Sequence, residues 1–497
     1  MRRIIVIFSY LLFSFQLMQA QVQITGKVVD EPNKEPLIGV LVETVRSTGE
    51  TVDERSKYGA ITDINGCFTL TVPSVDSEIK VSYFGYKEKT VKVSQDMIIE
   101  LDEDIRVSPR KERRMVALTA ADKQIIEHVG DLALRLMSRL PKQQSTIFSP
   151  LSIACLLSLT NDGAADQTQK ELNRLLGAVP EETDSFYQKM IPYFTDSRVG
   201  SRFLMANALF ANNNFQLMQP FLQQATDNYG ALVRNMDFTD SKAVREVNDW
   251  CARQTDGMIH KMADSTEPNM LLFGLNAVFF DSKWEDPFEK KDTKDETFTS
   301  ENGTRKKLPM MHKKDLFAYA AQKGYAALRL PYNGEVRYDM TLLLPDKGKT
   351  IANLLSKLSS QTLQQLQQQF RRARVDVKIP RFETEVHLHL NELLCQLGIP
   401  TAFNEDKADF SRMADVSAYG SKARICISKM LQKAKIEVNE EGTRAAAVTL
   451  DEQVIVGYMG KSRKYDEFVF HADRPFLYLI TERATGAILF IGQYHGE

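Results

Sequence analysis

The sequence predicts an α+β domain of about 380 residues, preceded by a small all-β sandwich. Three observations lead to this fold class. Apolar and polar residues alternate with a period of two from Val22 to Leu101, as in strands that bury one face. Residues 102–114 are charged and aperiodic, which is typical of a linker between domains. After the linker, helical spacing comes first and strand-like runs come later, so the two kinds of element are segregated.

Residues 1–20 have the features of a secretory signal peptide. Arg2 and Arg3 precede an apolar run from Ile4 to Leu17, and the small residue Ala20 ends the segment. The run is short for a membrane span, and polar residues interrupt it. No cysteine follows it directly as a lipid attachment point, and no later stretch is suited to span a membrane. We therefore expect a mature chain that is secreted, periplasmic or held at the cell surface.

Residues 21–101 are expected to form the sandwich. Asn65-Gly66 lies between two strand-like runs and can supply the positive φ angles of a tight hairpin turn. A calcium loop starting at Asp63 is rejected, because its glycine comes two positions too early for that motif. The segments TGKVVDEPNKEPLIGVLV, TDINGCFTL and VSYFGYKEKTV resemble a carboxypeptidase-regulatory-like domain, a β-sandwich at the start of many secreted and outer-membrane bacterial proteins. The resemblance implies a domain without chemistry of its own, with an adaptor or surface-docking role.

The charge of the chain argues against one class of partner. The formal net charge is -2 and the isoelectric point is about 6.4, so no global field attracts nucleic acid or an anionic membrane. The linker, residues 102–114, contains a basic cluster that could bind a polyanion, but solvated linker charge is the commoner reason for such clusters. The cluster comprises Arg110, Lys111, Arg113 and Arg114. We expect no nucleic-acid partner.

Residues 115–497 are expected to form the α+β domain. Apolar residues recur at helical spacing from Ile125 to Leu140, and this helix is expected to end before Pro141. Four later runs have the length and composition of strands, and two of them stop at a proline. These runs are Ala277–Phe280, Met340–Leu344, Val375–Ile379 and Phe468–Phe470.

The sequence contains no recognisable enzyme motif. A G-x-S-x-G elbow, an H-E-x-x-H helix, a P-loop and a strand-associated G-x-G-x-x-G are all missing. His387 and His389 would share one face of a strand, but no third ligand has matched spacing, so neither a metal nor another cofactor is expected. The five cysteines form neither a metal pattern nor a disulfide framework, and we expect small buried thiols. They are Cys67, Cys155, Cys251, Cys395 and Cys426.

One segment, NEEGTRAAAVT from Asn439 to Thr449, carries the functional argument. By itself it could cap and begin a helix at Thr443, because alanine favours helices. The residues after it, up to Ser462, have no helical face and indicate a long exposed connection. If the segment instead enters a sheet as a new strand, alternate side chains must fit a packed layer and so must be small. Threonine or alanine occupies each of these positions: Thr443, Ala445, Ala447 and Thr449.

The same segment resembles the proximal hinge of inhibitory serpins, and the resemblance continues in family order over residues 115–497. IFSPLSI resembles a buried strand and helix start, and MANALF and LNAVFFDSKWEDPF resemble strands of the central sheet. ADFSRM, ISKMLQKAKIEVNEEGT and DRPFLYLI complete the series. The resemblance implies the serpin fold, with a large central β-sheet, further sheets, about nine helices and an exposed reactive loop. We expect a monomer.

In inhibitory serpins the loop is a bait that a protease attacks, forming an acyl-enzyme. The cleaved loop then inserts into the central sheet and carries the protease with it, driven by strain stored in the uncleaved fold. A strand of about fourteen residues rises about 3.3 Å per residue, so the displacement is on the order of 45 Å. Deacylation stalls because misplacing a catalytic group by about 1 Å can cost ~10²-fold in rate. The resemblance thus implies an inhibitor of serine endopeptidases, with cysteine endopeptidases as a further class, and not an enzyme.

The resemblance also assigns roles to individual residues. The hinge comprises Glu440, Glu441, Gly442, Thr443, Ala445, Ala446 and Ala447. The shutter, where the sheet must part, comprises Ser149, Ser152, Asn276 and Gln432. Gln432 stands where the family commonly has histidine, and an amide gains no proton, which argues against acid-sensitive opening through this position. Trp284 is expected at the breach, where the loop first enters, and this place is also compatible with ordinary core packing.

Counting forward, with Gly442 as the fifteenth residue before the scissile bond, places that bond at Val456-Gly457. A small aliphatic residue suits a shallow primary pocket, so we expect an elastase-like or subtilisin-like target protease. The segment up to Pro475 is several residues longer than usual, which leaves later bonds open. Attack at these residues would imply other targets: Tyr458, Met459, Lys461 or Arg463.

Asp451 opposes the simple mechanism. After Thr449 the inward positions fall on Asp451 and Gln453, and an unpaired carboxylate facing the core is costly. Insertion would then be shallow beyond Leu450 or locally bulged. The small hinge residues favour an inhibitor, Asp451 favours a non-inhibitory serpin that binds a ligand or partner through its surface, and an undetected enzyme is the third hypothesis.

Overall fold

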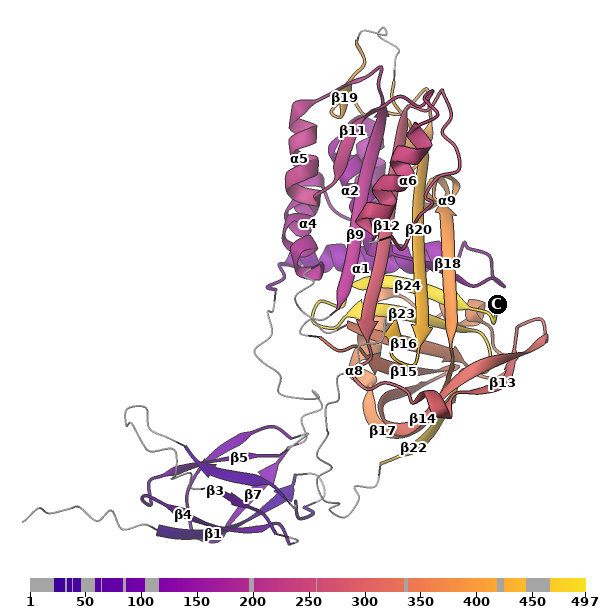
Figure 1. The fold of residues 1–497 in the computed structure, drawn as a ribbon. Helices are drawn as coiled ribbons and strands as arrows, with labels where there is room; N and C mark the ends of the chain where they lie inside the picture. The colour runs from indigo at the N-terminus through magenta and orange to yellow at the C-terminus, as the bar shows by residue number, and fades with distance from the viewer. Residues whose placement is uncertain are drawn as a thin grey trace, which may run out of the picture. The chain divides into compact units, whose positions relative to one another are not determined.

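The chain divides into two compact units in the computed structural model (Figure 1). The first unit holds the described residues up to 102, and the second holds those from 116 to the end. Each unit has a hydrophobic core of its own. The described residues are 22–31, 34–37, 39–45, 59–63, 65–83, 86–102, 116–195, 201–255, 257–334, 338–417, 424–443 and 465–497.

The first unit is built from seven short strands in its described residues. They are β1 (Val22–Asp30), β2 (Leu41–Thr44), β3 (Gly59–Ile61), β4 (Cys67–Val72), β5 (Glu78–Ser82), β6 (Lys89–Lys92) and β7 (Met97–Leu101). They form a three-stranded sheet of order β4-β1-β7 and a four-stranded sheet of order β3-β2-β5-β6. Alternate residues such as Phe68 and Leu70 point into one core that both sheets share. The unit is therefore a β-sandwich, as expected.

The turn at Asn65-Gly66 differs from the expected hairpin. Gly66 has a φ of 73°, and the Asp63 carboxylate accepts hydrogen bonds from the N–H groups of Asn65 and Cys67, both at 2.8 Å. However, the flanking strands β3 and β4 lie in different sheets. The residue types specify a turn but not the partner of the next strand, so here the turn carries the chain from one sheet to the other.

The helices of the second unit mostly precede its long strands. In the described residues they are α1 (Ala120–Met137), α2 (Pro150–Asp162), α3 (Asp166–Leu176), α4 (Pro180–Phe194), α5 (Gln219–Tyr229), α6 (Ala243–Gln254), α7 (Ile351–Leu355), α8 (Ser360–Gln369) and α9 (Asn391–Leu397). Short 3-10 turns lie at Lys290–Asp292 and Thr401–Phe403. α2 begins at Pro150, directly after its N-cap Ser149, and all 13 of its residues are buried.

A six-stranded sheet occupies the centre of the second unit. Its strands are β9 (Arg202–Asn212), β11 (Leu232–Met236), β12 (Leu272–Lys283), β18 (Phe382–His389), β20 (Ile427–Asn439) and β21 (Gly442–Thr443), in the order β11-β9-β12-β21-β20-β18. β12 and β20 also pair directly, in parallel, from Leu272↔Ile427 to Val278↔Ala434. We call the boundary between these two strands the β12–β20 junction. At one end of it the two strands are hydrogen-bonded to each other, and at the other end β21 lies between them.

The remaining strands form a nine-stranded and a two-stranded sheet. The larger sheet contains β8 (Thr146–Phe148), β13 (Lys294–Thr299), β14 (Arg305–Gln322), β15 (Tyr325–Pro331), β16 (Tyr338–Pro345), β17 (Arg371–Pro380), β22 (Glu467–His471), β23 (Phe476–Glu482) and β24 (Ile488–Tyr494). The smaller sheet pairs β10 (Gln216–Leu217) with β19 (Ala414–Asp415). The four strand-like runs recognised in the sequence lie in β12, β16, β17 and β22, and the expected α+β class is confirmed.

Helices cover both faces of the six-stranded sheet. The larger core contains α2 together with Val278 and Phe280 of β12, whereas α6 contributes Trp250 to a second core that contains Ala277. Alternate residues of β12 therefore face α2 and α6 in turn, as the period of a strand dictates. Figure 1 shows α6 in front of the sheet and α2 behind it.

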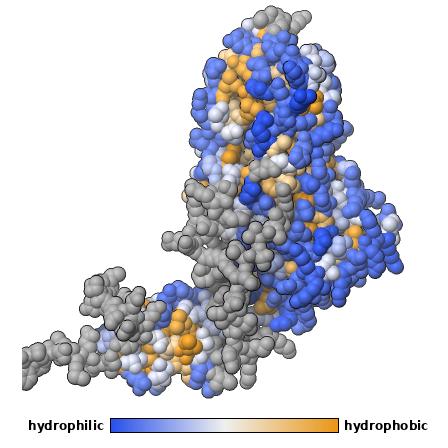
Figure 2. Space-filling view, in the orientation of Figure 1, coloured by the Kyte–Doolittle hydropathy of each residue, from blue (hydrophilic) through white to orange (hydrophobic). Residues whose placement is uncertain are grey.

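The visible surface of the second unit is mostly hydrophilic, and apolar residues gather near the end where α5 and β11 lie (Figure 2). Among the described residues, no helix combines the length and the apolar character needed to cross a membrane.

The cysteines are free thiols, but not all of them are buried. Cys155, Cys251 and Cys426 are buried as expected, whereas Cys395 is half-buried. Cys67 is exposed, because it falls on the outward face of β4, where residues alternate between the core and solvent.

Candidate functional site

The predicted hinge begins inside the six-stranded sheet. β21 consists of Gly442 and Thr443, and it pairs antiparallel with β12 on one side and with β20 on the other. Thr443 lies opposite Ser282 and Val438 and is completely buried. The first small residue of the segment thus occupies an interior position of the sheet.

Gly442 is the residue that this geometry requires at the bend. Its φ is 156°, and a Cβ atom at this position would lie 2.2 Å from the Ser282 carbonyl oxygen and 2.6 Å from the Lys283 Cα. Both neighbours are backbone atoms of a central strand, which cannot move aside without disturbing the packed sheet. A larger residue would therefore push β21 away from β12.

Two stacked aromatic residues receive the Thr443 side chain. The Thr443 hydroxyl lies 2.5 Å from the hydroxyl of Tyr332, which is buried. The Tyr332 ring stacks on Trp284, with centroids 4.5 Å apart and planes inclined by 16°. Trp284 donates from Nε1 to the Asn439 carbonyl oxygen at 2.9 Å, and its backbone N–H donates to the Glu441 carbonyl oxygen at 2.9 Å. Burial raises the pKa of Tyr332 well above its ordinary value, so the hydroxyl stays neutral.

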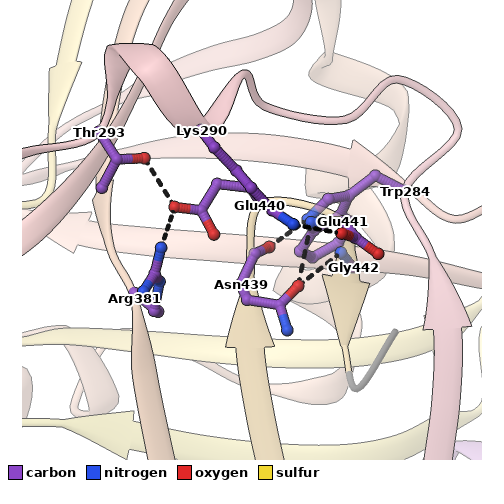
Figure 3. Close-up of polar contacts among 8 residues, drawn as sticks. All are labelled: Trp284, Lys290, Thr293, Arg381, Asn439, Glu440, Glu441 and Gly442. Carbon is purple, nitrogen blue, oxygen red and sulfur yellow. Dashed lines mark hydrogen bonds and ion pairs between the residues drawn. The ribbon is translucent and has the colours of Figure 1, made fainter. Parts of the chain in front are cut away.

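A buried carboxylate holds the turn that precedes β21 (Figure 3). Glu440 is 1% exposed, forms an ion pair with Arg381 and accepts a hydrogen bond from the Thr293 hydroxyl at 2.7 Å. Burial by itself raises the pKa of this carboxyl group, but hydrogen bonds from Arg381 and Thr293 outweigh burial and hold the pKa below its ordinary value. Glu440 is therefore charged at neutral pH and ties the turn to Arg381, which directly precedes β18.

The rest of the turn is bonded to itself and to a surface lysine (Figure 3). The Asn439 side-chain oxygen accepts from the N–H groups of Glu441 at 3.0 Å and Gly442 at 3.3 Å. Lys290 lies 2.6 Å from the Glu441 carboxylate in an exposed ion pair, a kind of contact that contributes little to stability. The buried groups, rather than this pair, fix the turn.

The four predicted shutter residues meet in a buried hydrogen-bond network. Gln432 donates to the Asn276 side-chain oxygen at 2.5 Å, and its own side-chain oxygen accepts from the Ser149 N–H at 2.9 Å. Asn276 in turn contacts the Ser152 side chain and donates to the Asn207 side-chain oxygen at 2.6 Å. Asn276 and Gln432 face each other across the β12–β20 junction. The network therefore joins the two strands and α2, and separating the strands must break it.

The structure does not describe the other residues that the sequence predicts to be functional. Ala445, Ala446, Ala447, Val456 and Gly457 lie outside the described residues, as do Asp451 and the predicted signal peptide. Their roles stay predictions.

The histidine pair seen in the sequence lies on β18. The rings of His387 and His389 are 5.2 Å apart, and no group of three metal-ligating side chains comes together in the described part of the chain.

Sequence reasoning missed three residues of the site: Tyr332, Arg381 and Thr293. Each follows or precedes a strand in a stretch remote from the hinge, and nothing in its local pattern points to Thr443 or Glu440. One signal was available for Arg381. Two adjacent acids at Glu440 and Glu441 predict a cationic partner if either of them is buried, although not which cation.

Comparison with known proteins identifies the two units. A family model described as Serpin (serine protease inhibitor) matches residues 127–496, and a model described as CarboxypepD_reg-like domain matches residues 24–112. The human leukocyte elastase inhibitor is 32% identical over 377 residues, which covers 73% of this chain and 96% of the relative. An uncharacterized serpin-like protein of Thermococcus kodakarensis is 30% identical over 379 residues, which covers 75% of this chain and 85% of the relative.

Solved structures agree with these matches. The thermophilic serpin tengpin in its native state superposes with a TM-score of 0.69 at 27% identity, over 77% of this chain and 96% of tengpin. Human thyroxine-binding globulin complexed with thyroxine gives a TM-score of 0.67 at 25% identity, over 76% of this chain and all of that protein. Both resemblances read from the sequence are thereby confirmed. The chain belongs to the serpin family, with a carboxypeptidase-regulatory-like domain ahead of its serpin domain.

Proposed function

We propose that this protein is a secreted inhibitor that traps serine endopeptidases as a suicide substrate. The main support for the proposal is the position of β21 in the six-stranded sheet. Gly442 and Thr443 lie between β12 and β20 with complete burial of Thr443, so the sheet already accepts the start of the loop as a strand. If the strand continued past Thr443, the small residues Ala445 and Ala447 would come to the same face. Family membership supports the same conclusion, because the matching model describes serine protease inhibitors.

The chemistry belongs to the protease, and the serpin supplies the bait and the movement. The catalytic serine of the protease attacks the carbonyl carbon of Val456, the Gly457 amine leaves with a proton, and an ester remains. Insertion of the 13 residues from Arg444 to Val456 then moves the ester by on the order of 45 Å. Water cannot complete the reaction once the oxyanion donors are displaced, since losing one donor costs ~10² to 10³-fold in rate.

The target is proposed to be elastase-like or subtilisin-like. Val456 suits a shallow primary pocket, and one relative, 32% identical, is named as an inhibitor of leukocyte elastase. The predicted signal peptide, residues 1–20, supports an encounter outside the cytoplasm, and the protein is proposed to act there as a monomer.

The central test incubates the purified chain with elastase-like, subtilisin-like and trypsin-like proteases. A complex that survives denaturing electrophoresis supports inhibition, and the mass of the released peptide locates the scissile bond. Complete cleavage without any complex across this panel contradicts the proposal for these targets.

A substitution in β21 tests whether insertion is the trapping step. Thr443→Arg places a long charged side chain where the Tyr332 hydroxyl and the core now lie, so the variant is expected to be cleaved as a substrate without forming a complex. Thr304→Arg, at an exposed turn, makes the same change away from the sheet and should leave complex formation intact. Complex formation by Thr443→Arg at the wild-type level would refute insertion.

One observation favours a second candidate, a non-inhibitory serpin that binds a ligand or partner. Extended in the register of β21, the loop brings Asp451 to the core face opposite Gly274 and Met430, where a carboxylate has no partner. Thyroxine-binding globulin, solved with thyroxine, is a ligand-binding neighbour at 25% identity. Cleavage of the loop with neither a complex nor a rise in thermal stability would favour this candidate.

A further inference from the structure

Two aspartates meet where the helices α2, α4 and α5 pack against one another (Figure 1). Asp162 is the last residue of α2, Asp184 lies in α4, and Tyr229 is the last residue of α5. The Tyr229 hydroxyl donates to the Asp184 carboxylate at 2.7 Å, and the Asp162 carboxyl group interacts with both residues. Only 7% of Asp162 and 3% of Tyr229 is exposed. We call these three residues the acid cluster.

A charged Asp162 would lack the donors that a buried carboxylate needs. Both of its carboxyl oxygens are buried, and neither accepts a well-formed hydrogen bond within the described part of the chain. The single hydroxyl proton of Tyr229 goes to Asp184, and burial raises the pKa of Tyr229 well above its ordinary value, so this phenol stays neutral. A protonated Asp162 can itself donate to Asp184, whereas two adjacent buried carboxylates repel each other. The geometry therefore favours one proton shared by the two aspartates.

The surroundings of Asp162 add further negative charge. Burial raises the pKa of Asp162 to about 9, and the charges of Asp184 and of Glu181 on α4 act in the same direction. Asp166 at the start of α3 and Arg412, which bonds to the backbone just after α2, are both exposed, so solvent screens their charges. Asp162 therefore keeps its proton at neutral pH.

The helix that carries Asp162 is attached to both sides of the β12–β20 junction. At its start, Ser149 exchanges two hydrogen bonds with Gln432 of β20. At its end, Asp162 contacts α4 and α5, which flank β9 in the sequence, and α5 leads directly into β11. β9 and β11 lie on the β12 side of the junction. When the junction parts, α2 must therefore leave one of its attachments, and the acid cluster is the one that lacks a donor to Asp162.

We propose that the parting of β12 and β20 releases one proton from the acid cluster, so that pH regulates how readily the six-stranded sheet opens. The inference rests on the proposed inhibitory function and adds a regulation of its sheet-opening step. Once α2 leaves α4 and α5, Asp162 meets water, and its pKa returns toward the ordinary value of 3.8. Between about pH 4 and pH 9 the open sheet therefore binds one proton fewer than the closed sheet, and each unit of rising pH favours opening by about tenfold.

Hydrogen exchange of the uncleaved full chain, without a protease, tests this coupling. Mass spectrometry measures the protection of residues 272–278 and 427–434, the directly paired part of the junction, after correction for the intrinsic effect of pH on exchange. In the wild type, this protection should fall by about tenfold per pH unit between pH 6 and pH 8. Asp162→Asn keeps a neutral donor to Asp184, so its protection should change by less than about twofold over the same range. Asp227→Asn, at an exposed position on α5, is the matched control and should behave as the wild type does.

A second measurement reports the proton itself. At pH 7, the infrared difference spectrum of the wild type minus Asp162→Asn should contain the carbonyl band of a protonated carboxylic acid. The inference is overturned if that band is missing, if wild-type protection does not change with pH, or if Asp162→Asn retains the change, even when the chain traps proteases. A pH-dependent protection that Asp162→Asn abolishes supports it even when no protease is trapped, so the inference and the proposed function fail separately.

Discussion

At the scale of single residues, the hydroxyl pair of Thr443 and Tyr332 decides how firmly the start of the loop is held. Both groups are buried and lie 2.5 Å apart. Removing one of them leaves the other without a partner, whereas removing both leaves a nearly isosteric apolar contact.

This geometry predicts strong coupling in a double-mutant cycle. Tyr332→Phe and Thr443→Val should each lower the free energy of unfolding by about 1–2 kcal/mol, and the double variant should lose little more than either alone. Denaturant unfolding of the uncleaved chain measures all three. Tyr338→Phe is the matched control, since Tyr338 also packs on Phe280 but donates to the Phe194 carbonyl oxygen at 2.9 Å. Additive losses in the Tyr332 cycle would show that the two hydroxyls do not interact.

The Glu440 carboxylate predicts how this end of the sheet responds to acid. Its pKa is held below the ordinary value of 4.5, so its contribution to stability is complete above about pH 4.5 and is lost as the pH falls through the lower, folded pKa. Glu440→Gln should therefore be less stable than the wild type at neutral pH, and the difference should close in acid. Thermal unfolding of both proteins between pH 7 and pH 3 checks this. A difference that stays constant over this range would mean that the ion pair with Arg381 is not its source.

At the scale of elements, the register of β21 predicts where insertion becomes unfavourable. Leu450 would lie between Leu275 and Leu431, which are buried in the core beneath α6, so insertion is favourable up to that point. The next residue, Asp451, turns to the opposite face and meets Gly274 and Met430. A carboxylate there must stay charged without a partner or take up a proton.

Replacing Asp451 should therefore deepen the insertion. In the chain cleaved within the loop, Asp451→Ala is expected to raise the free energy of unfolding by on the order of 2 kcal/mol. In the uncleaved chain, the same substitution should leave the free energy of unfolding unchanged. Glu452→Ala is the control, because residue 452 would face the other side of the sheet, beside Lys429. Thermal unfolding of each variant, before and after cleavage of the loop, measures both effects. Equal effects of both substitutions would contradict the register.

The elements also show what a sequence can and cannot predict. Small residues at alternate positions from Thr443 predicted a strand that fits a packed layer, and β21 begins as that pattern requires. Tyr332 could not be predicted, because its contact with Thr443 depends on how two sheets meet, across 111 positions of sequence. Asn65-Gly66 failed as a hairpin for the same reason. Local chemistry specifies a turn, and long-range packing selects the partner strand.

At the scale of the whole molecule, the two units should unfold independently. The sandwich and the serpin domain have separate cores, and the residues between them, 103–115, are charged in sequence. Calorimetry of the full chain should show two transitions. A chain that starts at residue 116 should keep the serpin transition within about 1 °C and form complexes at the full-length rate. A shift of several degrees would reveal stabilising contact between the units.

The stacking of Trp284 on Tyr332 makes Trp284 an intrinsic fluorescence probe of this site. The chain contains only two tryptophans, and the other, Trp250, lies on α6 against Phe210. Trp250→Phe would leave one fluorophore, whose indole N–H is bonded to the carbonyl oxygen of Asn439 at the entrance of the sheet. Any event that fills or empties that entrance changes the surroundings of this indole. The emission of Trp284 can therefore be used to follow the rates of loop docking, of protease binding and of β21 release. No added label is needed.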